Sequence, residues 1–194
     1  MKKTGTGLLL AATSATPAWA HQAEGAAGGF LTGLSHPVSG PDHVVAMIAV
    51  GLWGAQLGRP ALWLLPVMFP AVMACGSFLG LVGMPLPGVE VGIAASAVVL
   101  GLMVMRAARP PLALAVAIVS VFALFHGHAH GTELPEDQSG LHYSIGFVTA
   151  TGLLHGVGIL IGAVDRWPWG PKLLKALGAF VLLSGLYFLW GAVA

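Results

Sequence analysis

Charged side chains are scarce in this chain. Only 8% of its 194 residues are Asp, Glu, Lys or Arg, whereas 57% are hydrophobic, and the mean hydropathy is +0.88. A soluble domain covers its surface with ions, so this composition excludes an ordinary soluble fold and predicts a protein of the lipid bilayer. The formal net charge is +1 and the basic residues form no run, which excludes a nucleic-acid partner.

Cysteine is almost absent as well. The single thiol, Cys75, lies within an apolar stretch, so the chain has neither an intrachain disulfide nor a cysteine-based metal motif. It also has no G-x-x-x-x-G-K-[ST] sequence, which excludes ATP hydrolysis at a P-loop of its own. Any metal ion must therefore be held by nitrogen and oxygen.

The first 20 residues have the pattern of a secretory signal peptide. Two lysines open the chain, an apolar stretch runs from Leu8 to Ala12, and Ala18-Trp19-Ala20 is an A-x-A cleavage sequence. The apolar stretch is too short, and too rich in Thr, Ser and Gly, to span a bilayer. We expect a signal peptide over residues 1–20 and a single membrane domain over residues 21–194. The α-amine and imidazole of His21 would then be free to chelate a metal.

Six apolar segments follow, each close to the about 20 residues that a helix needs to cross a bilayer. They are Phe30 to Gly58, Ala61 to Gly83, Glu90 to Met105, Pro111 to His128, Leu141 to Val164 and Lys172 to Val193. The sequence therefore predicts an all-α protein with six transmembrane helices.

The basic residues of the connections predict the orientation, because cytoplasmic loops collect Lys and Arg. If the mature N-terminus is outside, the basic residues between the segments all fall inside: Arg59, Arg106, Arg109, Arg166, Lys172 and Lys175. We expect a multi-pass protein of the bacterial inner membrane with both the mature N-terminus and the C-terminus in the periplasm. Four tryptophans near the predicted inner interface are expected to be anchors: Trp53, Trp63, Trp167 and Trp169.

Three pairs of glycines have the small-xxx-small spacing that lets membrane helices approach closely. These pairs are Gly76 and Gly80, Gly152 and Gly156, and Gly158 and Gly162. They predict helix contacts and say nothing about the number of subunits.

The first cluster of polar residues is His36-Pro37-Val38-Ser39-Gly40-Pro41-Asp42-His43. Its two prolines and one glycine predict that the first helix is broken between His36 and Asp42, which directs side chains into the bundle. Broken membrane helices often form transport sites. Asp42 also has a structural interpretation, because Ser39-x-x-Asp42 resembles a capping box.

The second cluster is His126-Gly127-His128-Ala129-His130-Gly131-Thr132-Glu133. If the helix continues through it, His126, His130 and Glu133 share one face and can chelate one ion. His128 points away from that face. Alternatively, the two glycines end the helix and the histidines are solvated in a loop.

Other ionisable residues have two interpretations each. Glu90 opens the third segment, where a carboxylate is a metal candidate and also suits the positive end of a helix. His155 lies deep in its segment and is expected to hydrogen-bond across helices. His142, Glu136 and Asp137 are expected to form a solvated acidic rim.

Imidazole and carboxylate ligands suit Ni, Co, Zn, Cu or Fe(II) and disfavour the all-oxygen sites of Mg and Ca. Three functions remain open on this chemistry. The protein is a metal permease, an intramembrane zinc-dependent hydrolase with three ligands and a bound water, or a bis-histidine haem carrier.

Both clusters resemble the signatures of the HupE/UreJ family of nickel and cobalt permeases. The first match is His36-Pro37-x-x-Gly40-x-Asp42-His43 with Ala46-Met47 and Val50-Gly51-x-Trp53, and the second is Phe125-His126-Gly127-x-Ala129-His130-Gly131-x-Glu133. The spacing between His36 and Asp42 differs by one residue from the His-x4-Asp-His pattern of a broader group of nickel and cobalt transporters.

The resemblance implies a secondary permease, not an enzyme, that supplies nickel for hydrogenase or urease maturation, or cobalt for cobalamin synthesis. The metal is its substrate, and no cofactor is bound permanently. The metal-binding residues that the resemblance implies are His36, Asp42, His43, His130 and Glu133, with Glu90 and His126 as further candidates.

Overall fold

The computed structural model describes residues 26–134 and 139–194. Every regular element in those ranges is helical: α1 (Ala26–Ser39), α2 (Pro41–Leu57), α3 (Ala61–Leu81), α4 (Val89–Met105), α5 (Leu112–Thr132), α6 (Gly140–Gly162), the 3₁₀ helix η1 (Ala163–Arg166) and α7 (Gly170–Val193). This confirms the all-α prediction. The predicted signal peptide, His21, Glu136 and Asp137 lie outside the described residues.

Several of these helices are long and apolar enough to cross a membrane, so the chain is a multi-pass membrane protein. The four that meet this criterion are Ala61–Leu81, Leu112–Thr132, Gly140–Arg166 and Gly170–Val193, and Val89–Met105 is a shorter apolar helix. The first apolar segment consists of two helices instead of one. Four helices meet the criterion, so a count of six spans requires two more: α4, and the first segment formed by α1 and α2 together.

The division falls at Gly40, inside the predicted interval from His36 to Asp42. α1 ends at Ser39, and Pro41 is the first residue of α2. Proline has no N–H to donate and is favoured at the first position of a helix, so this site both ends one helix and starts the next. The side chains on either side of Gly40 are thereby directed to the same region.

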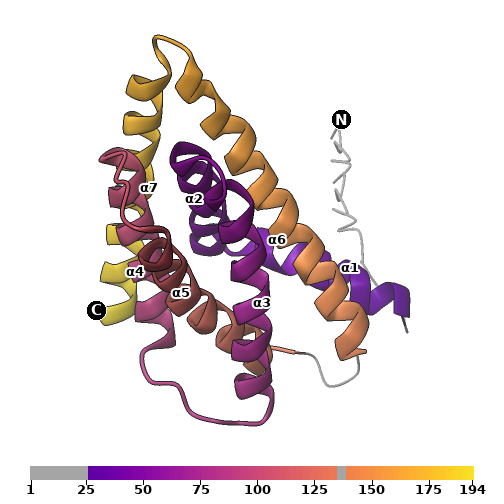
Figure 1. Cartoon of the computed structure of the whole chain (residues 1–194). Coiled ribbons are helices and arrows are strands. Elements are labelled where there is room, and N and C mark those ends of the chain that lie inside the picture. The colour runs from indigo at the N-terminus through magenta and orange to yellow at the C-terminus, as the bar shows by residue number, and fades with distance from the viewer. Residues whose placement is uncertain (1–25, 135–138) are drawn as a thin grey trace, which may run out of the picture.

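Helix α2 lies at the centre of the bundle, and it contacts α3, α4, α6 and α7. Its buried side chains include Met47, Val50 and Trp53, none of which has any exposed surface. Around it, α3 packs on α5, α4 on α7, and α1 on α6. Figure 1 shows the connection between α6 and α7 at one end of the bundle and the connection between α3 and α4 at the other.

Glycines set the close contact of α3 with α5. A Cβ atom at Gly127 would collide with the Met73 carbonyl, and one at Gly131 would collide with the Ser77 carbonyl. Gly76 and Gly80 meet the backbone of α5 in the same way, which confirms their predicted packing role. The glycines of the second histidine cluster therefore hold the helix against its neighbour and do not end it.

The other two glycine pairs have different outcomes. Gly158 and Gly162 pack against another helix, α2, which confirms their predicted packing role. Gly152 and Gly156 face open space, with no atom within 4 Å of a Cβ at either position, so the predicted contact there is wrong. Spacing alone cannot distinguish a glycine that faces another helix from one that faces lipid.

Side chains from two of the connections and from the helices beside them line a single cavity. The cavity of about 480 Å³ is lined by Gln56 of α2, Arg106, Asp165 and Lys175 of α7, among others, so the connection from α4 to α5 lies at the same end of the bundle as the connection from α6 to α7. Trp53 differs from its predicted role as an interface anchor. It is fully buried and its Nε1 donates a hydrogen bond of 2.9 Å to the Ala108 carbonyl, which joins α2 to the segment between α4 and α5.

Candidate metal centre

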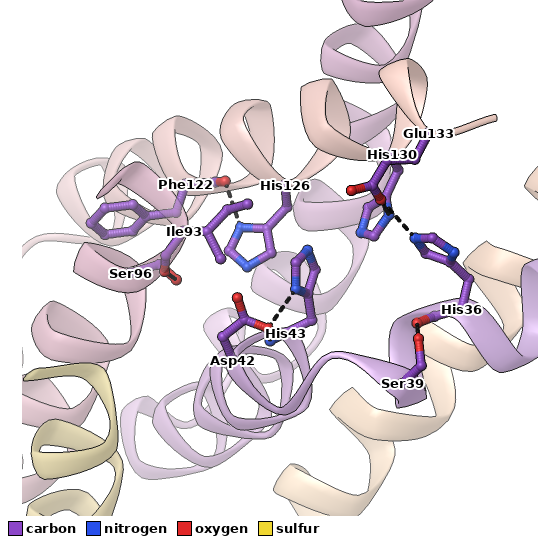
Figure 2. A network of polar contacts seen from close by, with 10 residues as sticks. All are labelled: His36, Ser39, Asp42, His43, Ile93, Ser96, Phe122, His126, His130 and Glu133. Atoms are coloured by element: carbon purple, nitrogen blue, oxygen red, sulfur yellow. Dashed lines mark hydrogen bonds and ion pairs between the residues drawn. The ribbon is translucent and has the colours of Figure 1, made fainter. Parts of the chain in front are cut away.

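Three helix ends bring the two histidine clusters together. The end of α1 carries His36, the start of α2 carries Asp42 and His43, and the last turns of α5 carry His126 and His130. Figure 2 shows these side chains pointing toward one another across the space between the three helices. The break at Gly40 makes this possible, because a continuous helix would place His36 and His43 about 10 Å apart along its axis.

At the exposed side, His36, His130 and Glu133 form what we call the rim triad. The Nε2 atom of His36 lies 3.0 Å from Glu133 Oε2, and His130 Nδ1 lies 3.8 Å from the same oxygen. One ligand atom from each residue lies within 4.8 Å of the others. Glu133 is 54% exposed while His130 is only 3% exposed, so the triad connects the surface with the interior.

Asp42 fixes the orientation of His43. Its Oδ1 atom is 2.9 Å from His43 Nδ1 and also accepts the His43 backbone N–H at 2.9 Å. When Nδ1 donates to the carboxylate, Nε2 carries the lone pair that a metal requires. That Nε2 atom is buried and has no hydrogen-bond partner.

A backbone carbonyl orients His126 so that, as in His43, Nδ1 is hydrogen-bonded and Nε2 is left free. Its Nδ1 donates a hydrogen bond of 2.9 Å to the Phe122 carbonyl one turn earlier in α5. Its Nε2 is buried and unpartnered, and the ring centroid lies 4.8 Å from that of His43. His43 and His126 therefore each offer an unpaired ring nitrogen.

The four imidazoles form a continuous arrangement, the histidine row, in the order His36, His130, His43 and His126. Successive ring centroids are 4.7, 4.6 and 4.8 Å apart. A porphyrin does not fit between rings this close, so these pairs cannot be the axial ligands of a haem.

The histidine row contains polar atoms that no group among residues 26–134 and 139–194 satisfies. Both nitrogens of His130 lack partners, in addition to one nitrogen each of His43 and His126. A buried polar group without a hydrogen bond costs about 1–3 kcal/mol, and native proteins keep few of them. Lone pairs left free at the junction of three helices suit a site whose partner is a cation.

Asp42 and Glu90 face a different cavity. Both line a space of about 370 Å³ together with Tyr187 and Trp190 of α7. Glu90 is exposed and is not part of the rim triad. The structure thus brings five of the predicted metal residues together: His36, His43, His126, His130 and Glu133. Asp42 is joined to this group by its hydrogen bonds to His43. Glu90 shares only a cavity with Asp42.

Three polar residues near the row have roles that the structure defines: Ser39, His128 and His155. The capping box of Ser39 and Asp42 is not formed, because Gly40 is the N-cap and Ser39 donates to the His36 carbonyl. His128 turns away from the row, as predicted, and its Nε2 donates a hydrogen bond of 2.8 Å to the Met84 carbonyl. His155 approaches the Pro66 carbonyl of α3, in agreement with the predicted contact across helices, although the geometry falls short of an ordinary hydrogen bond.

Aromatic side chains surround the histidine row, and sequence reasoning missed them. The Phe147 ring lies 4.2 Å from that of His130, and the Tyr143 ring lies 5.8 Å from that of His36. Both are buried on α6. They belong to an ordinary apolar run, so the sequence carries no signal that would single them out.

The fold and the site together define a multi-pass membrane protein with a candidate metal centre of histidine and carboxylate. A family model described as HupE / UreJ protein matches residues 8–188. Protein HupE of Rhizobium leguminosarum bv. viciae is 42% identical over 181 residues, which cover 93% of this chain and 95% of that protein. The chain belongs to the HupE/UreJ family, which confirms the resemblance. No solved structure matches it.

Proposed function

We propose that this protein is a secondary permease that takes up a divalent transition-metal ion, nickel or cobalt, across the bacterial inner membrane. The observation that carries the proposal is the histidine row, with its unpaired nitrogens on His130, His43 and His126. Its rim is exposed and its interior end is fully buried, which is the arrangement expected of an entry path.

Movement along the row requires that no single position hold the ion too tightly. The rim triad offers a carboxylate and two imidazoles within 4.8 Å of one another, and the next positions offer imidazoles alone. An ion can exchange one ligand at a time between rings less than 5 Å apart. This spacing keeps the ion coordinated while it loses water.

The driving force in this proposal is the membrane potential. A potential that is negative inside favours entry of a cation by about 2.3 kcal/mol per charge per 100 mV. For entry, the rim triad faces the periplasm, in agreement with the orientation that the basic connections predict. The divalent metal is the substrate, which goes to the maturation of a hydrogenase or urease.

An intramembrane zinc-dependent hydrolase is the alternative. Such an enzyme needs a closed set of three ligands and one open position for water, and the rim triad has the correct number. The row nevertheless continues beyond the triad to His43 and His126, whose free nitrogens a hydrolase does not need. Ligands placed at intervals favour transport.

The test is uptake of radioactive nickel by cells that produce the protein, compared with cells that lack it. We expect Glu133→Gln to lower uptake strongly, because it removes the charge between His36 and His130. Thr132→Ala is the matched control, since Thr132 is the adjacent residue and its hydroxyl only donates to the Ala129 carbonyl. Equal uptake with and without the protein would refute the permease. Metal-dependent cleavage of lipid or peptide by the purified protein would favour the hydrolase.

A further inference from the structure

His155 is a further buried histidine, and one aromatic ring, that of Phe69, contacts both His155 and the histidine row. The centroid of the Phe69 ring lies 5.4 Å from that of His126 and 5.3 Å from that of His155, and both pairs are T-shaped. Phe69 is fully buried, and His155 is 1% exposed. Phe69 thus links one more imidazole to the histidine row through ring contacts.

Within the part of the chain that the structure describes, neither nitrogen of His155 makes a hydrogen bond of ordinary geometry. If this residue only filled space, an apolar side chain would do so without the cost of about 1–3 kcal/mol for each unsatisfied group. The nearby Pro66 carbonyl faces the ring without a hydrogen bond of ordinary geometry. Because Pro70 has no N–H, that carbonyl also lacks its helical donor within α3.

Thr151 shares the buried face of α6 with His155, one turn earlier. It has no exposed surface, and its hydroxyl has no partner. A helical threonine usually donates to the carbonyl four residues before it, and Thr149, which is exposed, does so to Ile145 at 2.7 Å. The free hydroxyl of Thr151 therefore distinguishes it from a threonine of the same helix that faces outward.

His155 lies farther along α6 than Tyr143 and Phe147, the residues of that helix whose rings contact the histidine row. It lies about 15 residues beyond the start of α6, which corresponds to about 22 Å at the α-helical rise. A Cβ atom at Gly51 would collide with the His155 carbonyl, so α2 and α6 are in direct contact at this level. Gly51 in turn lies about 12 Å along α2 from His43.

From these observations we infer that His155 and Thr151 form a second binding position for a divalent transition-metal ion, separated from the histidine row by Phe69. The inference rests on the proposed function, because it adds a later position on the same path. The ligands are an imidazole nitrogen and a hydroxyl oxygen, with the Pro66 carbonyl within reach. Rotation of the Phe69 side chain opens the way from His126, and its ring face can contact a cation as it passes.

A single introduced thiol tests the position directly. Cys75 is the only cysteine of the chain, so His155→Cys in a Cys75→Ser background carries one thiol, at the proposed position. When the purified full-length protein is saturated with Co²⁺, we expect a sulfur-to-cobalt charge-transfer band in the near ultraviolet. Val157→Cys in the same background is the control, because Val157 is 42% exposed on the same helix, and it should give no band. Absence of the band from the His155→Cys protein would overturn the inference.

Measurements of nickel uptake test whether this second position lies on the transport path. We expect His155→Ala to lower the initial rate of nickel uptake about tenfold or more, the loss typical of a disturbed metal ligand, and His155→Cys to retain more uptake than His155→Ala. Thr151→Val should lower the rate and Thr149→Val should not. A His155→Ala rate equal to that of the Cys75→Ser parent would overturn the inference while the permease stands. If the parent itself takes up no nickel, the proposed function fails, and the cobalt band still decides whether a metal binds here.

Discussion

The carboxylate of Asp42 accepts two hydrogen bonds from the residue that follows it, one from the His43 backbone and one from its imidazole, each 2.9 Å long. Adjacent residues of a helix ordinarily point in different directions. They meet here because Asp42 is in the first turn of α2, where the chain has just left the break at Gly40. The broken helix thereby determines which nitrogen of His43 is available.

Asp42→Asn should weaken metal binding without displacing His43. The amide keeps an oxygen that can accept the same hydrogen bonds but removes the negative charge that makes the imidazole a stronger ligand. Loss of such an outer partner typically costs 10–100-fold in metal affinity. Equilibrium binding of Ni²⁺ to the purified protein measures the effect. Ser39→Ala is the control, because Ser39 donates only to the His36 carbonyl. Unchanged affinity in Asp42→Asn would show that the charge has no role.

The orientation predicts which positions an impermeant thiol reagent can reach in intact spheroplasts. In a Cys75→Ser background, Ser139→Cys should react from the outside, whereas Arg109→Cys should react only after the membrane is opened. Both positions are exposed, so burial does not explain a difference. Reaction of both from the same side would contradict the predicted topology.

Much of the fold could be predicted from the apolar segments, because the need to satisfy backbone groups in lipid leaves a helix as the choice for each. The break near Gly40 followed from Pro37 and Pro41. Helix packing could be predicted only in part, because the spacing of Gly158 and Gly162 is the same as that of Gly152 and Gly156, yet only the first pair contacts another helix.

The candidate site was predictable where residues share a helix and uncertain where they do not. The face shared by His126 and His130 followed from helical spacing. The contact of His36 with Glu133, 97 residues apart, depends on how α1 meets α5, which no local pattern specifies. Sequence position also gave no indication that Glu90 would lie apart from the row or that Phe69 would join His126 to His155.

Gly127→Ala should destabilise the protein, whereas Gly152→Ala should not. The added methyl group at Gly127 meets the Met73 backbone, which cannot move away as a side chain can, and such overpacking costs about 1–3 kcal/mol. At Gly152 the space is open, and alanine favours the helix by up to about 1 kcal/mol. Thermal unfolding in detergent, followed by tryptophan fluorescence, compares the two. Equal midpoints would contradict the close contact of α3 with α5.

His128 and His130 are two residues apart on α5, and the structure predicts opposite effects of the same substitution. His128 donates a hydrogen bond to the Met84 carbonyl, which connects α5 to the segment that follows α3. His128→Leu removes that bond and leaves the carbonyl unpartnered, so the free energy of unfolding should fall by about 1–3 kcal/mol. The histidine row remains, and Ni²⁺ affinity should stay close to that of the parent protein.

His130→Leu should do the reverse. Both His130 nitrogens are buried without partners, so leucine removes two unsatisfied groups, and stability should be unchanged or higher. Metal affinity should fall at least tenfold, because the ring lies between His36 and His43 and faces Glu133. Unfolding in the absence of metal and Ni²⁺ binding, measured on both variants, separate the two roles. If His130→Leu destabilised the metal-free protein as much as His128→Leu does, His130 would be a structural residue and not a ligand.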